Sequence, residues 1–248
     1  MAETVYRDYD SDALYAQYNN RAQISEADLA AIKDDQNARS ADYRANAARK
    51  HLDVQYGDDP RERLDIFLPD ADNAPMLAFM HGGYWQWNDK EGFEFLAKEL
   101  NAHGAAFANI EYTLCPGVTL AELTNQCQRA VAHLWKEAGS YGYDRDRIVV
   151  SGHSAGGHLT AMMQATDWPA VDPAVPSNAV AGAEIESVSR RIAPLACAGA
   201  PRRRARSRLR SPCSRNSMRR VRRLAAFALR SLAAESPQAG IQSAGSCS

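Results

Sequence analysis

The stretch Arg147-Ile-Val-Val-Ser-Gly-His-Ser-Ala-Gly156 determines the fold that we expect for this chain. It begins with a short apolar run, which is typical of a buried strand, and continues with small residues at which a helix can start. A serine at such a junction lies in a tight turn, and Gly152 and Gly156 leave the space that the turn requires. Ser154 is therefore a candidate nucleophile, and the backbone N–H of Ala155 is a candidate donor to a bound acyl oxygen. The alternative is ordinary helix capping, because Gly and Ser are common where helices begin.

A second glycine-rich loop lies upstream of this turn. The apolar run Met76-Leu-Ala-Phe-Met80 ends in His81-Gly-Gly-Tyr-Trp85. Only glycine lets the main chain approach a reacting acyl group without a Cβ atom in the way, so Gly82 and Gly83 are candidate oxyanion-hole residues. An ordinary Gly-Gly turn is the alternative. The two loops are about 70 residues apart with a strand and a helix pattern between them, which favours the functional interpretation.

With these two loops, the chain resembles the kynurenine formamidase (arylformamidase) branch of the α/β-hydrolase superfamily from about residue 14 to about residue 185. The matching segments are Tyr18-Asn-Asn-Arg-Ala22, Tyr56-Gly57, Leu64-Asp-Ile-Phe-Leu-Pro69, His81-Gly-Gly-Tyr-Trp85, Glu111-Tyr-Thr-Leu-Cys-Pro116 and Gly152-His-Ser-Ala-Gly-Gly-His158. Lipase-like esterases usually carry a third glycine in the first loop and an acidic residue before the serine. This chain has Tyr84-Trp85 and His153 at those places, which favours the formamidase branch.

The resemblance implies a serine hydrolase that cleaves a small acyl group from an aryl amide such as N-formylkynurenine. Ser154 would be the nucleophile, and Gly82, Gly83 and Ala155 would surround the oxyanion. A short-chain carboxylesterase is the alternative activity. The implied partner is a small-molecule substrate, and neither a cofactor nor a metal is implied.

Aromatic residues follow the first glycine loop. A formamide carries the smallest acyl group, so the pocket beside the nucleophile can be tight, while an aromatic leaving group needs a flat apolar wall. We expect Tyr84 and Trp85 to bind the substrate, with Trp87 as a further candidate whose alternative role is plain packing. The sequence has no H-E-x-x-H, no paired cysteine set and no phosphate-binding glycine loop, so we expect no metal.

Alternating strand and helix patterns predict an α/β protein with a mostly parallel sheet and helices on both faces. The predicted strands are residues 52–56, 64–68, 76–80, 105–110 and 147–151. The predicted helices are residues 11–20, 25–49, 90–101, 120–138 and 155–166, and we expect Ser25 to cap the second of them. This is the α/β-hydrolase fold that the resemblance implies, without its last strands.

The charge pattern divides the chain into an N-terminal helical segment (residues 1–50), an incomplete α/β-hydrolase core (51–189) and an Arg-rich tail (190–248). Residues 1–189 have 15 Lys and Arg against 29 Asp and Glu, a net charge of −14. The tail has 14 Arg against Glu235 alone, a net charge of +13, and it contains no Asp, Tyr, Trp, His or Lys. So abrupt a change of composition suggests that the tail is not part of the same domain.

The tail has three interpretations. We favour a reading-frame shift near residues 181–191 of a GC-rich gene, because shifted GC-rich codons tend to give Arg, Ala, Ser, Pro and Gly. The alternatives are a tail that binds nucleic acid or anionic membranes through its arginines, and an amphipathic helix over residues 218–235. Translating the coding DNA in the other two frames tests the first: it is wrong if neither frame restores an Asp and a late His.

The expected catalytic base is missing. The α/β-hydrolase fold places an acid and then a histidine after the nucleophile, but no histidine follows His158. Asp167 and Asp172 come too early for the acid and should belong to the loop after the nucleophile helix, while His81 and His153 should orient the glycine loops by hydrogen bonds. Loss of the histidine of a serine triad costs about a million-fold in kcat, so we expect the 248-residue chain to be nearly inactive. A catalytically dead hydrolase-like chain with a basic, anion-binding tail is the corresponding alternative function.

Composition sets the remaining expectations. The chain is 45% hydrophobic, has no apolar stretch near the roughly 18 residues of a membrane span, and begins with acidic rather than basic and apolar residues. We expect a soluble, cytoplasmic protein without a membrane partner; nucleic-acid binding is disfavoured, and a homodimer is left open. An odd number of cysteines without paired spacing indicates reduced thiols: Cys115, Cys127, Cys197, Cys213 and Cys247.

Overall fold

The computed structural model describes residues 4–19, 24–180 and 182–186 of the chain. The Arg-rich tail lies outside the described residues, and with it the predicted helix over residues 218–235 and three of the five cysteines. Among the described residues, Cys115 and Cys127 are both free thiols, as predicted. None of the described helices combines the length and the apolar content that a membrane span requires.

Two helices precede the main sheet. Their bounds, with the small antiparallel strand pair at the start, are β1 Thr4–Tyr6, β2 Tyr9–Asp10, α1 Ser11–Tyr18 and α2 Glu26–Asn46. The capping prediction is confirmed, because the Ser25 hydroxyl oxygen accepts a hydrogen bond from the Asp28 N–H at 3.1 Å. Helix α2 ends at residue 46 rather than 49, since Lys50 already begins the next strand and its ammonium group donates to the Ala45 carbonyl at 2.8 Å.

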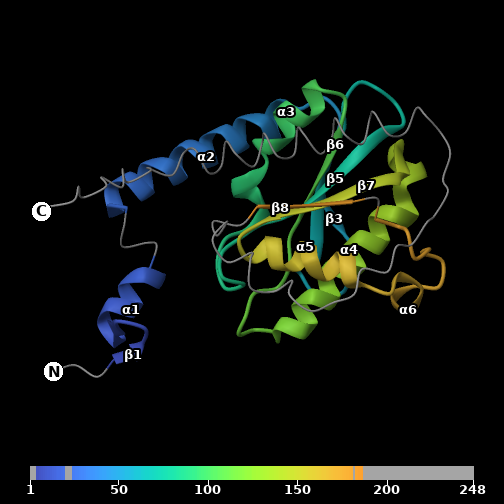
Figure 1. Cartoon of the computed structure of the whole chain (residues 1–248). Coiled ribbons are helices and arrows are strands. Elements are labelled where there is room, and N and C mark those ends of the chain that lie inside the picture. Colours follow the sequence, from blue (N-terminus) through green and yellow to red (C-terminus); the bar gives the residue numbers. More distant parts are fainter. Residues whose placement is uncertain (1–3, 20–23, 181, 187–248) are drawn as a thin grey trace, which may run out of the picture.

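Six strands form the main sheet in the order β3-β4-β6-β5-β7-β8 (Figure 1). Their bounds are β3 Lys50–Gln55, β4 Arg63–Phe67, β5 Ala74–Met80, β6 Ala106–Ile110, β7 Tyr143–His153 and β8 Gly182–Glu186. The pairings β6-β5, β5-β7 and β7-β8 are parallel, whereas β3-β4 and β4-β6 are antiparallel. The predicted parallel arrangement therefore holds for the half of the sheet that leads to the two glycine loops, and β8 is a strand that the sequence patterns did not predict.

Helices cover both faces of this sheet, as expected (Figure 1). The remaining helices are η2 Lys90–Phe93, α3 Leu96–Ala102, α4 Leu120–Tyr141, α5 Ala155–Ala165 and α6 Trp168–Val171. Strand β5 shows why both faces are apolar: Met76 and Ala78 pack in the core cluster beneath α4 and α5, while Leu77 and Phe79 pack in the cluster beneath α3. This α/β-hydrolase-like arrangement confirms the predicted fold class.

The predicted helix over residues 90–101 is wrong as a single element. A 3-10 turn, η2, and helix α3 replace it, with a break at Glu94 and Phe95. The physical reason is electrostatic: Lys90 is fully buried and its ammonium group is directed at carboxylates of β3 and β4. The helical periodicity of the sequence did not indicate that Lys90 would be buried against these carboxylates.

Candidate active site

Ser154 lies in a strained turn between β7 and α5. Its backbone angles are φ 54° and ψ −114°, a conformation that non-glycine residues rarely adopt. The turn follows His153, the last residue of β7, and precedes Ala155, the first residue of α5. Ser154 itself is exposed, while Ala155 is buried.

The two glycines around Ser154 are required by packing. A Cβ atom at Gly152 would lie 2.2 Å from the carbonyl oxygen of Gly156, and a Cβ atom at Gly156 would lie 1.9 Å from the carbonyl oxygen of Met80. Both distances are far below van der Waals contact, so the start of α5 presses directly on the ends of β7 and β5. The G-x-S-x-G spacing is therefore a steric requirement of this junction.

The second glycine loop lies against the serine turn. Strands β5 and β7 are paired up to Met80 and Gly152, so both loops leave the sheet at the same edge. A Cβ atom at Gly82 would lie 3.1 Å from the Cβ atom of Ser154, and Gly83 has a φ of 127° that favours glycine. These contacts bring together the residues that the sequence had singled out 70 positions apart.

Several backbone N–H groups at this junction have no hydrogen-bond partner among the described residues. Within the part of the chain that the structure describes, the N–H groups of Gly83 and Ala155 form no hydrogen bond. Gly83 is further held by its neighbours, because its carbonyl oxygen accepts from the N–H of Gln86 and of Trp87, each at 2.9 Å. Such unpaired donors beside a serine hydroxyl can bind an oxyanion.

The aromatic residues of the loop differ in exposure. Tyr84 is 67% exposed and Trp87 57% exposed, and their rings lie 6.1 Å apart. Trp85 packs more deeply, with its ring edge-on to His158 of α5 at 5.4 Å. Tyr84 and Trp85 both have a positive φ, of 57° and 60°, so the loop directs these rings at a cost in backbone strain.

The buried side chains of His81 and Glu111 support the loop of Gly82 and Gly83. His81 and Glu111 are both fully buried, and the His81 Nε2 atom lies 3.1 Å from a Glu111 carboxylate oxygen. Arg61 donates to the same oxygen at 2.6 Å, and the Lys90 N–H donates to the other at 2.9 Å. Burial opposes the charge of Glu111, but His81, the Lys90 N–H and Arg61 outweigh it and lower the pKa of this carboxyl group.

The sequence did not predict this buried pair. Of the two histidines expected to orient the glycine loops by hydrogen bonds, His81 forms them, whereas the ring of His153 forms none to another described residue. Burial lowers the pKa of His153 instead. Glu111 could have been noticed, because an acidic residue directly after the apolar run of β6 must be buried with a partner.

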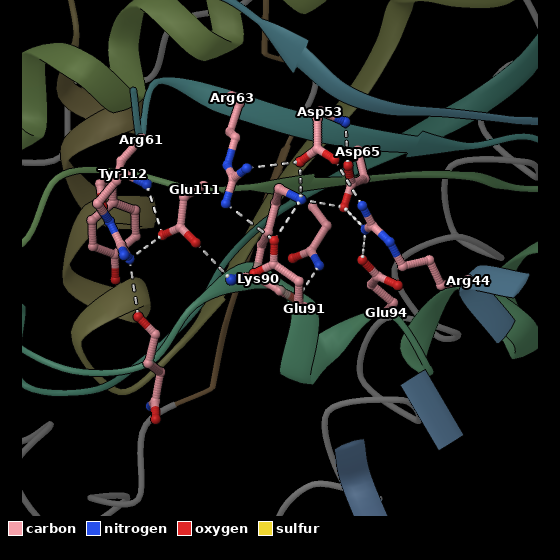
Figure 2. Close-up of polar contacts among 12 residues, drawn as sticks. Arg44, Asp53, Arg61, Arg63, Asp65, Lys90, Glu91, Glu94, Glu111 and Tyr112 are labelled. Carbon is pink, nitrogen blue, oxygen red and sulfur yellow. Dashed lines mark hydrogen bonds and ion pairs between the residues drawn. The ribbon is translucent and has the colours of Figure 1, made fainter. Parts of the chain in front are cut away.

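A larger, partly buried charge cluster adjoins Glu111 (Figure 2). Its centre is Lys90, whose ammonium group lies 2.6 Å from Asp65, 2.9 Å from Asp53 and 3.1 Å from Glu91. Burial opposes the charge on Lys90, but these carboxylates outweigh it and raise its pKa. Arg44 of α2 joins Asp65 at 2.8 Å, so the cluster fixes α2 to the sheet and to the segment after the glycine loop.

Glu94 makes this cluster pH-dependent. Burial and the nearby Asp65 raise the pKa of Glu94 to about 8, although Arg44 opposes the shift. Because the folded pKa lies above the ordinary value of 4.5, the contribution of Glu94 to stability is full below pH 4.5 and is lost as the pH rises through about 8.

Glu94→Gln should reduce the pH dependence of the free energy of unfolding. We expect the decrease in free energy of unfolding from pH 5 to pH 8 to become smaller by about 1 to 3 kcal/mol. This is less than the full shift would give, because Arg44 is partly exposed and solvent screens the cluster. Urea unfolding at both pH values measures the change, with the exposed Glu99→Gln as the control. An unchanged pH dependence in Glu94→Gln would contradict the assignment.

No side chain among the described residues forms a hydrogen bond with the Ser154 hydroxyl group, so none is in place as its general base. Asp167 precedes α6 and Asp172 ends it, which confirms that both belong to the loop after α5. Asp172 is also engaged elsewhere, in an ion pair with Lys136 at 2.9 Å. His158 lies one turn into α5, and its ring is edge-on to Trp85 at 5.4 Å.

Comparisons with known proteins agree with this geometry. The model of the BD-FAE family matches residues 64–188, about half of the chain, and this range contains both glycine loops and Glu111. The chain belongs to the BD-FAE family. This membership and the fold confirm the resemblance to the α/β-hydrolases that the sequence indicated.

Curated relatives of this BD-FAE protein are hydrolases. Kynurenine formamidase from Danio rerio is 33% identical over 123 residues, which cover 49% of this chain and 41% of the relative. A probable isoprenylcysteine alpha-carbonyl methylesterase from Oryza sativa subsp. japonica is 33% identical over 110 residues, which cover 44% of this chain and 27% of the relative. The chain thus spans less than half of the length of either relative, and the coarse activity that they support is hydrolysis.

A solved structure supports the fold. The putative thioesterase from Silicibacter sp. TM1040 is 37% identical, with a TM-score of 0.55, and the alignment covers 66% of this chain and 57% of that chain.

Proposed function

We propose that Ser154 is the nucleophile of a hydrolase that cleaves a small acyl group from an aryl amide. The observation that carries this proposal is the strained backbone of an exposed Ser154, with Gly82 packed against its Cβ position. Strain of this kind persists only where the surrounding structure enforces it, and here it presents a hydroxyl group to solvent at the edge of the sheet.

The oxyanion would be bound by backbone amides. The unpaired N–H groups of Gly83 and Ala155 support this assignment, and Gly82 provides the close approach of the main chain. Each donor that is aimed at the developing charge is worth about 2.7 to 4 kcal/mol of transition-state stabilisation.

The proposed substrate class is supported by the aromatic residues after the first glycine loop and by two of the matching relatives. Tyr84 and Trp85 supply aromatic surface at the mouth of the site, with Trp87 beside them, which suits an aromatic leaving group. The matching kynurenine formamidase favours an aryl formamide, and the matching methylesterase makes a short-chain carboxylic ester the second candidate.

The 248-residue chain should react slowly, because no histidine follows His158 to activate Ser154. Without the base, only the oxyanion hole and substrate binding remain, and these accelerate the reaction by about 10³ to 10⁴ over water. Added imidazole should raise the rate, because it can replace the missing base.

Covalent labelling tests the nucleophile. We expect an aryl fluorophosphonate to label the chain slowly at Ser154 and to leave Ser154→Ala unlabelled, because only the strained hydroxyl lies beside oxyanion donors. Mass spectrometry of the labelled peptide gives the site, and Ser140→Ala, an exposed helix position, is the control. Labelling at another residue, or undiminished labelling of Ser154→Ala, would contradict the proposal.

Turnover in the presence of imidazole then separates the two substrate classes. Faster hydrolysis of N-formylkynurenine than of a short-chain aryl ester would support the formamidase assignment, and the reverse would support the esterase. A rapid burst of acylation without imidazole would show that the chain does not need the missing histidine.

A further inference from the structure

Both ring nitrogens of His81 face hydrogen-bond acceptors. The Nε2 atom lies 3.1 Å from a Glu111 carboxylate oxygen, and the Nδ1 atom lies 2.9 Å from the carbonyl oxygen of Gly82. The hydroxyl group of Tyr112 is also near Nδ1, at 3.2 Å, but it donates its own proton to the His81 carbonyl at the shorter distance of 2.7 Å. The hydroxyl oxygen is thus left as a third acceptor.

A neutral imidazole does not fit this environment. It carries one N–H and one lone pair, so one ring nitrogen would place its lone pair against an acceptor in a fully buried site. Glu111 cannot supply the missing proton, because its lowered pKa keeps it ionised and its oxygens accept from Arg61, Tyr112 and Lys90.

We infer that His81 is an imidazolium ion held by Glu111, and that it acts as a positioning residue for the Gly82–Gly83 peptide. The positioning role rests on the proposed function, whereas the protonation state does not.

The mechanism follows from the planarity of the peptide. The Gly82 carbonyl oxygen accepts from the His81 Nδ1 atom and from the Asn88 side-chain amide at 3.0 Å. In a trans peptide the carbonyl and the next N–H point in opposite directions, so two donors on this oxygen fix the direction of the Gly83 N–H. They also polarise the peptide, which strengthens the Gly83 N–H as a donor to an oxyanion.

The surroundings can hold a positive charge at this position. The His81 ring is stacked on Tyr112, with ring centroids 4.3 Å apart, and on Phe93, with centroids 5.9 Å apart, and among the described residues it is paired with the Glu111 carboxylate. Arg61 shares that carboxylate, but it reaches it from a partly exposed position, where solvent moderates the repulsion between the two cations.

Nitrogen NMR of the whole chain labelled with ¹⁵N-histidine tests the protonation state. At pH 7 we expect both His81 ring nitrogens to give the shifts of protonated nitrogens, with the exposed His103 as the reference. The His81 signals are assigned by substituting the other five histidines one at a time. A His81 ring with one unprotonated nitrogen in the native chain would overturn the inference, and this measurement requires no variant of the buried pair.

Glu111→Gln tests the role of the charge. We expect it to return His81 to a neutral ring and to slow fluorophosphonate labelling of Ser154 by about 10- to 100-fold, since small displacements of positioning groups have effects of this size. Glu99→Gln, which removes the carboxylate beside the exposed His103, should change neither. If the native chain is not labelled at all, the proposed function fails while the NMR result still stands. An unchanged labelling rate in a folded Glu111→Gln with a neutral His81 would refute the positioning role.

Discussion

Gly156→Ala should destabilise the protein by at least about 3 kcal/mol, at the upper end of the range for overpacked cores. The added Cβ atom would lie 1.9 Å from the Met80 carbonyl oxygen and 2.7 Å from that of His81. Both atoms belong to the main chain, so no side chain can rotate to relieve the contact. Either α5 moves away from β5, or the end of β5 is displaced.

Urea unfolding measures this cost, and Gly139→Ala is the matched control. Gly139 lies in helix α4 and has no atom within 4 Å of the position of a Cβ atom. Alanine there should stabilise the helix by about 0.5 to 1 kcal/mol. A Gly156→Ala variant as stable as the control would mean that the contact between α5 and β5 is looser than the structure shows.

Lys90→Met should cost about 3 to 5 kcal/mol, because it leaves the buried carboxylate of Asp65 without its ammonium partner. Methionine fills a similar volume, so the loss is electrostatic and not a cavity effect. Urea unfolding at pH 7 gives the value. Lys136→Met, which breaks the exposed ion pair with Asp172, should have little effect.

A second change should recover part of this loss. Adding Asp65→Asn to Lys90→Met removes the carboxylate charge that lost its ammonium partner and keeps a group that can contact Arg44. The double variant should therefore be more stable than Lys90→Met alone, and the coupling between the two positions measures the pair. If the two changes were simply additive, the ion pair would contribute nothing to stability.

The sequence predicted the parts of the fold that depend on short patterns. The apolar runs gave β4 to β7 within a few residues, since a strand buried on both faces needs an uninterrupted apolar segment. The glycine spacing around Ser154 identified the strained turn, because steric limits leave few sequences for such a junction. The two glycine loops were predicted to be parts of one oxyanion site, because only glycine lets the main chain approach a reacting acyl group.

The features that the sequence did not predict depend on contacts between residues that are distant along the chain. Lys90 looked like an ordinary helical residue, yet its charge is neutralised by Asp53 of β3 and Asp65 of β4. The breaking of the helix over residues 90–101 follows from that contact. Glu111 was visible only as part of a motif, and its four donors come from residues up to 50 positions away.

The position of strand β5 in the sheet also limits how the site can open. The strand pairs with both β6 and β7, it ends in the loop of Gly82 and Gly83, and its last carbonyl group, that of Met80, packs directly against Gly156 of α5. The site therefore has no hinge of its own. Local fraying cannot separate Ser154 from that loop without breaking the interior ladder of the sheet, so the site should open and close only with the cooperative unit that contains the core.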